Sequence, residues 1–265
     1  MSTTITIAVI GHGDTGSLLA GELHNAGATV IGFDTVTPKN PTTAIAESLE
    51  EAVAGADVVL AINSPTLALR TAEQVAPLLP AGAIYADLNP GTPSSKRKLA
   101  ELFPEGSFAD VAILGTLTET GLNTPMAVSG SAGEKLSELL TPLGLTLDYV
   151  SANVGDAAAR QLIKSMLAKG ITGVLIDTLW AAESMGMAQW TLEEIKREFD
   201  AFTGETAQKD LTETSVNFKR RQIEIVDIVD MLAETGFEST MLAPVQFNYG
   251  RIMHGKKIPY AKPTN

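Results

Sequence analysis

The sequence predicts an α/β protein in two parts, a doubly wound parallel sheet followed by an all-helical domain. Three observations lead to this class: strand and helix patterns alternate over the first half, a glycine-rich turn follows the first strand, and strand patterns stop near Ser151. Strands that alternate with helices favour a mostly parallel sheet with helices on both faces. We place the two domains at residues 1–152 and 153–265.

The elements of the first domain follow from two periodicities. Short runs rich in β-branched residues predict strands at Thr4–Ile10, Ala28–Asp34, Asp57–Ile62, Ala83–Leu88, Ser107–Ile113, Met126–Ser129 and Thr146–Val150. Apolar residues at helical spacing predict helices between them, at Thr15–Asn25, Ala44–Ala54, Thr66–Leu79, Pro93–Phe103 and Ala132–Leu140.

The second domain opens with a long helix. Asp156–Met185 contains no proline and keeps a helical apolar period over 30 residues, a length of about 45 Å. Shorter helices are predicted at Thr191–Phe202, Val216–Thr235 and Ala243–Met253. A helix longer than its own domain needs a partner surface, so we expect a homodimer through the helical domain. Trp180 and Trp190 are interpreted as core or interface anchors.

Composition excludes several classes of protein. The 265 residues carry a net charge of −12 and no cysteine, which argues against nucleic-acid and anionic-membrane partners and excludes disulfides and thiolate chemistry. Three separated histidines make a histidine-rich metal site improbable, and no metal is expected. No apolar run reaches the length of a membrane span. The first residues lack a basic leader, so we expect a cytoplasmic protein.

Residues 11–16 read G-H-G-D-T-G, which fits the G-x-G-x-x-G dinucleotide motif in its required place between a strand and a helix. The first glycine permits the tight turn, the second admits the pyrophosphate, and the third lets helix and strand pack closely. The helix N-terminus offers N–H groups to the phosphates. We assign to cofactor binding the whole run Gly11, His12, Gly13, Asp14, Thr15 and Gly16, with the His12 and Asp14 side chains interpreted as solvent-facing.

Asp34 ends the second strand, 18 residues after Gly16. A carboxylate there accepts hydrogen bonds from the ribose hydroxyls of NAD and repels the 2′-phosphate of NADP. Positions 35–38 hold no Arg or Lys, and Lys39 is the first basic residue. The sequence therefore favours NAD over NADP.

Two further loops follow strands at the edge where such folds bind ligands. Asn63, Ser64 and Pro65 follow the third strand, and Asn89 follows the fourth. Their amides and backbone groups are suited to the nicotinamide ribose and ring. The same residue types also populate ordinary turns, and residue type alone does not separate the two interpretations.

The stretch IAVIGHGDTGSLLAGELHNAGATVIGFD resembles the opening of the β-hydroxyacid dehydrogenases, and SLEEAVAGADVVLAINSP resembles their next helix and strand. The order of elements agrees over the whole chain. DVAILGTLTETGLNTPMAVSG and the Lys-Gly pair at 169–170 are most similar to a 6-phosphogluconate-dehydrogenase-like branch. The resemblance implies a Rossmann domain and an NAD(P)-dependent oxidoreductase that acts on a small hydroxy acid or related hydroxy-carbonyl compound.

The sequence departs from the family where the chemistry is expected. The register of the long helix puts Gln161 at the family's acid/base lysine and Ser165 at its asparagine. A glutamine has no accessible pKa and cannot take a hydroxyl proton. Lys164 lies one turn further on the same face, and we suggest it as the substitute acid/base. The alternative is a lysine that binds an anionic group of the substrate or is solvated.

The family's substrate motif is also altered, because Leu114 and Thr116 replace its serine and one of its glycines. Gly115, Thr116 and Lys169 are kept as candidate substrate residues. The basic run Lys219-Arg220-Arg221 could bind a substrate anion or form a solvated cluster with Glu224. Two other functions stay open: a dinucleotide-binding protein with lost or redirected chemistry, and an imine-type reductase, a relative that also lacks the family lysine.

Overall fold

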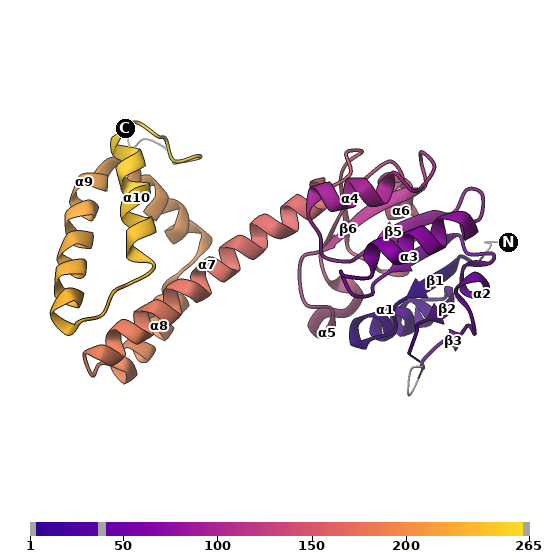
Figure 1. Ribbon diagram of the computed structural model, residues 1–265, viewed down its shortest axis with the longest axis horizontal. Coiled ribbons are helices and arrows are strands. Elements are labelled where there is room, and N and C mark those ends of the chain that lie inside the picture. The colour runs from indigo at the N-terminus through magenta and orange to yellow at the C-terminus, as the bar shows by residue number, and fades with distance from the viewer. Residues whose placement is uncertain (1–3, 37–40, 262–265) are drawn as a thin grey trace. The chain divides into compact units, whose positions relative to one another are not determined.

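The structure, a computed structural model, describes residues 4–36 and 41–261 (Figure 1). Lys39, the basic residue noted after Asp34, lies outside the described residues. The chain forms two compact units, Met1–Met166 and Leu167–Asn265. The units therefore divide inside the long helix, whereas the predicted domain boundary at 152/153 precedes that helix. Each unit is described by itself.

The first unit is built on an eight-stranded sheet in the order β3-β2-β1-β4-β5-β6-β7-β8. The strands are β1 Thr6–Ile10, β2 Thr29–Phe33, β3 Ala44–Ile45, β4 Val58–Ala61, β5 Ile84–Asp87, β6 Phe108–Ile113, β7 Met126–Ser129 and β8 Leu147–Ser151. β1 to β6 are parallel, and β7 pairs with β6 in the antiparallel sense. The chain moves outward in both directions from β1, so the strand order reverses between β1 and β4, where such sheets bind ligands. The predicted fold class is confirmed.

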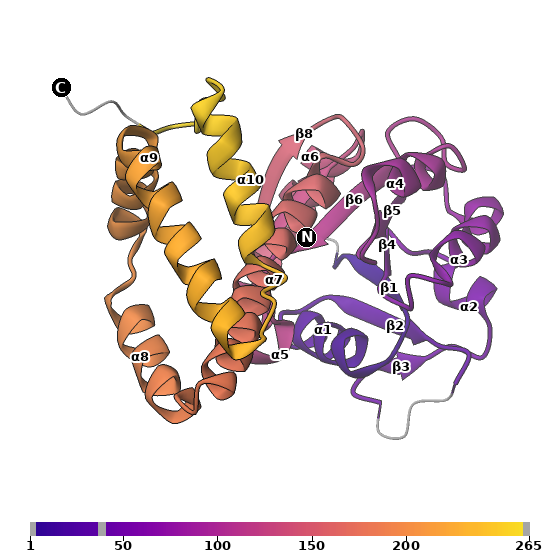
Figure 2. The ribbon, with the colours of Figure 1, turned by 60° about the vertical axis from the view of Figure 1, so that its left-hand side comes forward.

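The alternating faces of the strands divide the core into two layers. Ile7 and Val9 pack with α1 (Asp14–Asn25) and α6 (Gly133–Leu140) on one face. Ala8 and Ile10 pack on the other face with α2 (Leu49–Val53), α3 (Ala68–Val75) and α4 (Pro93–Ala100), and Figure 2 shows these helices apart from α1. Because successive strand residues point to opposite faces, each central strand is covered on both sides.

Two predicted helices of this unit differ from the structure, and one short helix was not predicted. The helix predicted at Ala44–Ala54 begins as strand β3, and α2 starts only after Ser48, whose side chain accepts a hydrogen bond from the Glu51 N–H. The helix predicted at Thr66–Leu79 is shorter, because α3 ends at Val75 and a 3-10 turn follows. The short helix α5 (Leu117–Thr120) was not predicted, since four residues are too few to show a helical period.

The second unit contains the rest of α7 (Asp156–Ser184), α8 (Ala188–Ala201), α9 (Gly204–Thr235) and α10 (Leu242–Met253). α9 begins well before the predicted Val216, with a capping box between Thr203 and Thr206, and is kinked at Asn217. Its first half is polar and gives no apolar period. The buried Asp177 ties α7 to the start of α10 by accepting hydrogen bonds from Ser239 and Thr240. Burial raises the pKa of Asp177, but these hydrogen bonds together lower it overall.

Across the part of the chain that is described, no helix is both long enough and apolar enough to cross a membrane. The described residues also bring no three His, Cys, Asp or Glu side chains together in a way that could hold a metal ion.

Candidate functional site

The glycine-rich turn joins β1 to α1, and in the structure a different local feature explains the glycine at each of its three positions. Gly11 has φ +104°, and a Cβ there would lie 2.6 Å from the Ile62 carbonyl oxygen. A Cβ on Gly16 would lie 1.8 Å from the Gly11 carbonyl oxygen, so only glycine lets α1 approach the turn this closely. Around Gly13 no atom lies within 4 Å of such a Cβ, and this side of the turn is open to a ligand.

The N-terminus of α1 lies at this opening. Its N-cap residue is Gly13, which has no side chain to cap the first N–H groups. A helix of 12 residues therefore presents its N–H groups and the positive end of its dipole to the open side. Asp14 is exposed at the first position, as predicted, and Thr15 follows it.

His12 is buried, which contradicts the interpretation of its side chain as solvent-facing. Its ring lies against β2, where a Cβ on Gly32 would be 2.0 Å from His12 Nε2. His12 Nδ1 lies 3.2 Å from Ser17 Oγ, which itself donates to the His12 carbonyl. Burial lowers the pKa of His12 more than the charge of Asp34 raises it, so the imidazole is neutral at pH 7. The ring acts as packing beneath the turn.

Asp34 is held at the end of β2 by the turn itself. The His12 backbone N–H donates to Asp34 Oδ2 at 2.6 Å, and the Val36 N–H donates to Oδ1 at 3.0 Å. The Thr35 hydroxyl also donates to Oδ1, at 3.4 Å, so the remaining lone pair for a further donor is on Oδ2. The carboxylate lines a cavity of about 260 Å³ that also includes Gly11, Asn63 and Arg70; we call it the Asp34 cavity.

Arg70, on α3, is a residue that the sequence reasoning missed. It lies 36 positions after Asp34, and the packing of α3 beside β4 brings it to the Asp34 cavity. A guanidinium binds phosphates and stacks on planar rings. Its presence bears directly on the choice between NAD and NADP.

A second cavity of about 360 Å³ lies at the carboxyl ends of β4, β5 and β6; we call it the Asn89 cavity. It brings together six predicted site residues: Thr15, Asn63, Asn89, Gly115, Thr116 and Gln161. Asn63 lines both cavities, so they adjoin along one edge of the sheet. Ser64 and Pro65 are exposed and line neither cavity.

The two candidate catalytic residues of α7 differ in their surroundings. Gln161 lines the Asn89 cavity, and its Nε2 donates to the Ile113 carbonyl at 3.0 Å. Lys164 is exposed, and its ammonium donates to the Leu114 carbonyl, one residue before the cavity wall at Gly115. The structure thus places Gln161 in the wall and Lys164 next to it. The role of Lys164 in proton transfer stays a prediction.

A buried ion cluster beneath the Asn89 cavity was also missed by sequence reasoning. Lys96 on α4 is 2% exposed, and its Nζ lies 2.6 Å from Asp87 Oδ2 and 3.0 Å from Asp110 Oδ1. In the sequence it stands in the run SSKRKL, which is typical of a solvated helix. Burial raises the pKa of the neighbouring Tyr85 hydroxyl well above its usual range, and the charge of Asp87 raises this pKa further.

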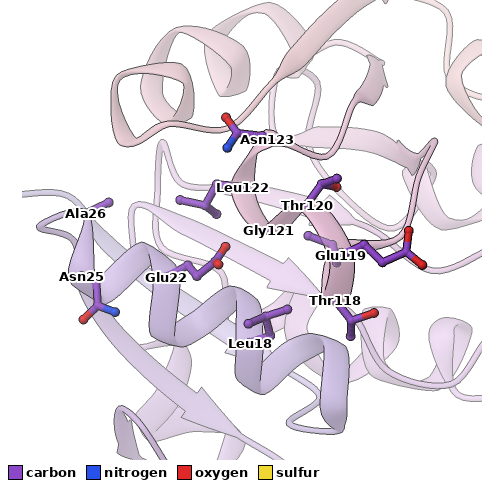
Figure 3. A pocket seen from close by; sticks show the side chains of 11 residues that line it. Leu18, Glu22, Asn25, Ala26, Thr118, Glu119, Thr120, Gly121, Leu122 and Asn123 are labelled. Atoms are coloured by element: carbon purple, nitrogen blue, oxygen red, sulfur yellow. The ribbon is translucent and has the colours of Figure 1, made fainter.

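A broader and more open cavity of about 740 Å³ lies between α1 and the turn after α5 (Figure 3). Glu22 reaches from α1 toward Gly121, where a Cβ would lie 2.5 Å from Glu22 Oε1. Leu117 and Thr118 line both this cavity and the Asn89 cavity. It therefore adjoins the candidate site but contains none of the predicted site residues.

Several predicted residues belong to the second unit: Lys169, Trp180, Trp190 and the basic run Lys219-Arg220-Arg221. Arg220 is exposed and pairs with Glu224 at 3.4 Å, as the solvated-cluster interpretation expects. Arg221 pairs instead with Asp210 and Glu213. Burial lowers the pKa of Arg221, but hydrogen bonds to Tyr249 and Asp210 raise it overall.

The doubly wound sheet, the glycine turn and the acid at the end of β2 define a dinucleotide-binding protein. Residues 6–150 match the NAD binding domain of 6-phosphogluconate dehydrogenase, and the chain belongs to this family. The resemblance to the hydroxyacid dehydrogenases is confirmed at this level.

Solved structures extend the likeness over nearly the whole chain. A conserved protein of unknown function, described as structurally similar to 3-hydroxyacid dehydrogenases, is 25% identical with a TM-score of 0.62, covering 94% of this chain and 97% of its own. A reductive aminase from Aspergillus terreus, bound to NADPH and ethyl levulinate, is 18% identical with a TM-score of 0.74, covering 96% and 95%. An imine reductase variant from Myxococcus stipitatus, bound to NAD⁺, is 18% identical with a TM-score of 0.76, covering 99% and 96%.

Proposed function

We propose that the protein is an NAD-dependent oxidoreductase that moves a hydride between the nicotinamide and a small hydroxy acid or related hydroxy-carbonyl compound. One observation carries the proposal: the uncapped N-terminus of α1 opens beside two cavities that share Asn63, one with a carboxylate and one with amides. The carboxylate suits a ribose, the helix N-terminus suits a diphosphate, and the amides suit a nicotinamide riboside.

The residues present fit such a dinucleotide. Gly13 leaves open space for the diphosphate at the α1 N-terminus, and Asp34 would hold the ribose hydroxyls. The amide oxygens of Asn63 and Asn89 are buried and have no partner within the described structure, as expected of acceptors reserved for a ligand. When bound, the nicotinamide accepts or supplies the hydride. Gln161 would orient the oxygen of the reacting carbon.

The cofactor preference gives the first test. Because the Asp34 carboxylate can accept a hydrogen bond from the ribose hydroxyls and repels a phosphate, we expect NADH to bind at least about tenfold more tightly than NADPH. Fluorescence titration of both cofactors measures the ratio. Asp34→Ala should remove most of the preference, whereas the matched variant Asp57→Ala, an exposed acid at the opposite end of the strands, should keep it.

A preference of the unmodified protein for NADPH would contradict the assignment to NAD. It would instead assign the 2′-phosphate to Arg70, and Arg70→Ala should then weaken NADPH alone. Binding of neither cofactor would overturn the oxidoreductase proposal.

A second candidate function, imine reduction, is favoured by a specific observation. Among the described residues, no titratable side chain lines the Asn89 cavity. Oxidation of an alcohol requires a base, because a proton leaves the oxygen as the hydride leaves the carbon. Hydride addition to a protonated imine gives the neutral amine and needs no proton donor at that step. Turnover of cyclic imines in place of hydroxy acids would select this candidate, and cofactor binding without turnover of either class would indicate redirected chemistry.

We also propose a homodimer through the helical unit. Large apolar side chains of this unit stay exposed in the single chain, among them Leu167, Trp180, Trp190, Ile223 and Phe247. An apolar cavity of about 470 Å³ lies between α7, α8, α9 and α10. Exposed apolar surface of this extent marks a protein interface. Light scattering should give twice the 27.9 kDa of one chain, and a mass of one chain at micromolar concentration would contradict the proposal.

A further inference from the structure

The Asn89 side chain shows an unusual division of its hydrogen bonds. It is 2% exposed, and its Nδ2 donates to Asp87 Oδ1 at 2.6 Å. Its Oδ1 is buried and has no partner among the described residues, although Asn89 lines the cavity. An ionised carboxylate only accepts hydrogen bonds. Asp87 therefore requires the NH₂ group of Asn89 on its side, and the amide oxygen is left for the cavity.

The ammonium of Lys96 compensates the charge of the buried Asp87 carboxylate. Its ammonium donates to Asp87 Oδ2 at 2.6 Å and to the Asp87 main-chain carbonyl at 3.1 Å. It also forms an ion pair with Asp110 Oδ1 at 3.0 Å. Buried carboxylates are retained only when they are paired, and this one lysine serves two of them.

The second carboxylate of the cluster, Asp110, binds Ser129 and the start of α7. Its Oδ2 accepts from the Ala158 N–H at 3.1 Å and from Ser129 Oγ at 3.3 Å. Ser129 Oγ in turn accepts from the Ala157 N–H. These bonds satisfy the first turn of α7. Asp87 and Asp110 thus share Lys96 but accept different further hydrogen bonds: Asp87 accepts from the Asn89 amide, and Asp110 accepts from Ser129 and the Ala158 N–H.

We propose that Lys96 and Asp87 are positioning residues that set the hydrogen-bond polarity of the Asn89 cavity. They fix the Asn89 amide with its oxygen inward, so that the cavity wall accepts a hydrogen bond and takes a ligand group with an N–H or O–H donor. Asn63 presents a second such oxygen, because its Nδ2 donates to Thr71 Oγ1 at 2.5 Å while its Oδ1 has no partner among the described residues. The inference rests on the proposed function, in which the nicotinamide carboxamide or its ribose hydroxyls supply the donor.

The orientation of the amide is tested on the protein without ligand. In the ¹H–¹⁵N spectrum, the Asn89 side-chain amide, identified by its absence in Asn89→Ala, should show one proton shifted downfield by the carboxylate. Asp87→Asn should lose that shift. The matched control Asp110→Asn removes the same charge from the same cluster but should keep the shift. Either variant leaves one carboxylate paired with Lys96, so both are expected to fold. Loss of the shift in both variants, or in neither, would overturn the proposal.

The donor on the ligand is tested by titration. Asp87→Asn should weaken NADH by about tenfold and leave ADP-ribose, which lacks the nicotinamide, unchanged. Asp110→Asn should bind NADH more tightly than Asp87→Asn does. NADH affinity that is equal in the unmodified protein and Asp87→Asn would overturn the inference. Failure of ADP-ribose to bind the unmodified protein would instead overturn the proposed function, while the spectrum still tests the amide.

A third ligand separates the two possible donors. The reduced acetylpyridine analogue of NADH keeps the ring carbonyl but lacks the amide N–H. If the carboxamide is the donor, the unmodified protein binds this analogue about tenfold more weakly than NADH, and Asp87→Asn removes that difference. If a ribose hydroxyl is the donor, the two ligands bind equally, and Asp87→Asn weakens both to the same extent.

Discussion

Lys164→Ala should lower kcat for a hydroxy-acid substrate by about 100-fold to 10,000-fold, the range that general acid/base catalysis contributes. Hydride removal from an alcohol requires a proton acceptor, and Gln161 in the cavity wall cannot serve as one. Lys164 lies one turn further along the same helix, where its ammonium donates to the Leu114 carbonyl beside the wall. NADH affinity should stay unchanged. Steady-state kinetics together with cofactor titration measure both quantities.

Two variants sharpen this experiment. Arg160→Ala removes an exposed cation of the same helix, one that pairs with Asp148, and should leave kcat within about threefold. Gln161→Lys places an ammonium in the wall itself and should raise kcat in the Lys164→Ala background. An unchanged kcat in Lys164→Ala would show that the lysine only braces the Leu114 loop, and it would strengthen the case for imine reduction.

Lys96→Met should lower the free energy of unfolding by about 3–5 kcal/mol, because it leaves two buried carboxylates without their cation. Asp87 and Asp110 are 1% and 0% exposed, so water cannot replace the ammonium without opening the core. Urea unfolding followed by circular dichroism measures the loss.

The matched comparison is the triple variant Lys96→Met with Asp87→Asn and Asp110→Asn. It removes all three charges and should recover much of the lost stability, since neutral buried groups of the same shape cost less than unpaired ions. A single variant as stable as the unmodified protein, or a triple variant no better than the single, would show that the cluster is not held by charge.

The parts of the site that the sequence predicts are those encoded by local spacing. The three glycines, the acid at the end of β2 and the loops after β4 and β5 each follow a strand pattern, and the sheet brings them to one edge. The parts that were missed depend on contacts between distant segments. Arg70 reaches the Asp34 cavity only through the packing of α3, and Lys96 resembles a surface residue until Asp87 and Asp110 enclose it.

The fold shows the same division. Long helices and buried strands carry a clear period and were predicted, apart from the polar first half of α9. Segments whose state is decided by a neighbour were not. β3 forms because Ala46 donates to the Gly32 carbonyl across the edge of the sheet, although its own sequence continues as a helix pattern.

The contact between His12 and Gly32 means that two positions twenty residues apart constrain each other's side chains. With the imidazole in place, any side chain at position 32 would overlap Nε2, and with a side chain at position 32 the ring has no room. A substitution at either position is therefore limited by the residue at the other. A small residue in place of the histidine would remove the closest clash at position 32, but Ile45 Cδ1 would still lie 2.7 Å from a Cβ there. The glycine is therefore required by two neighbours, even though position 32 lies outside the motif.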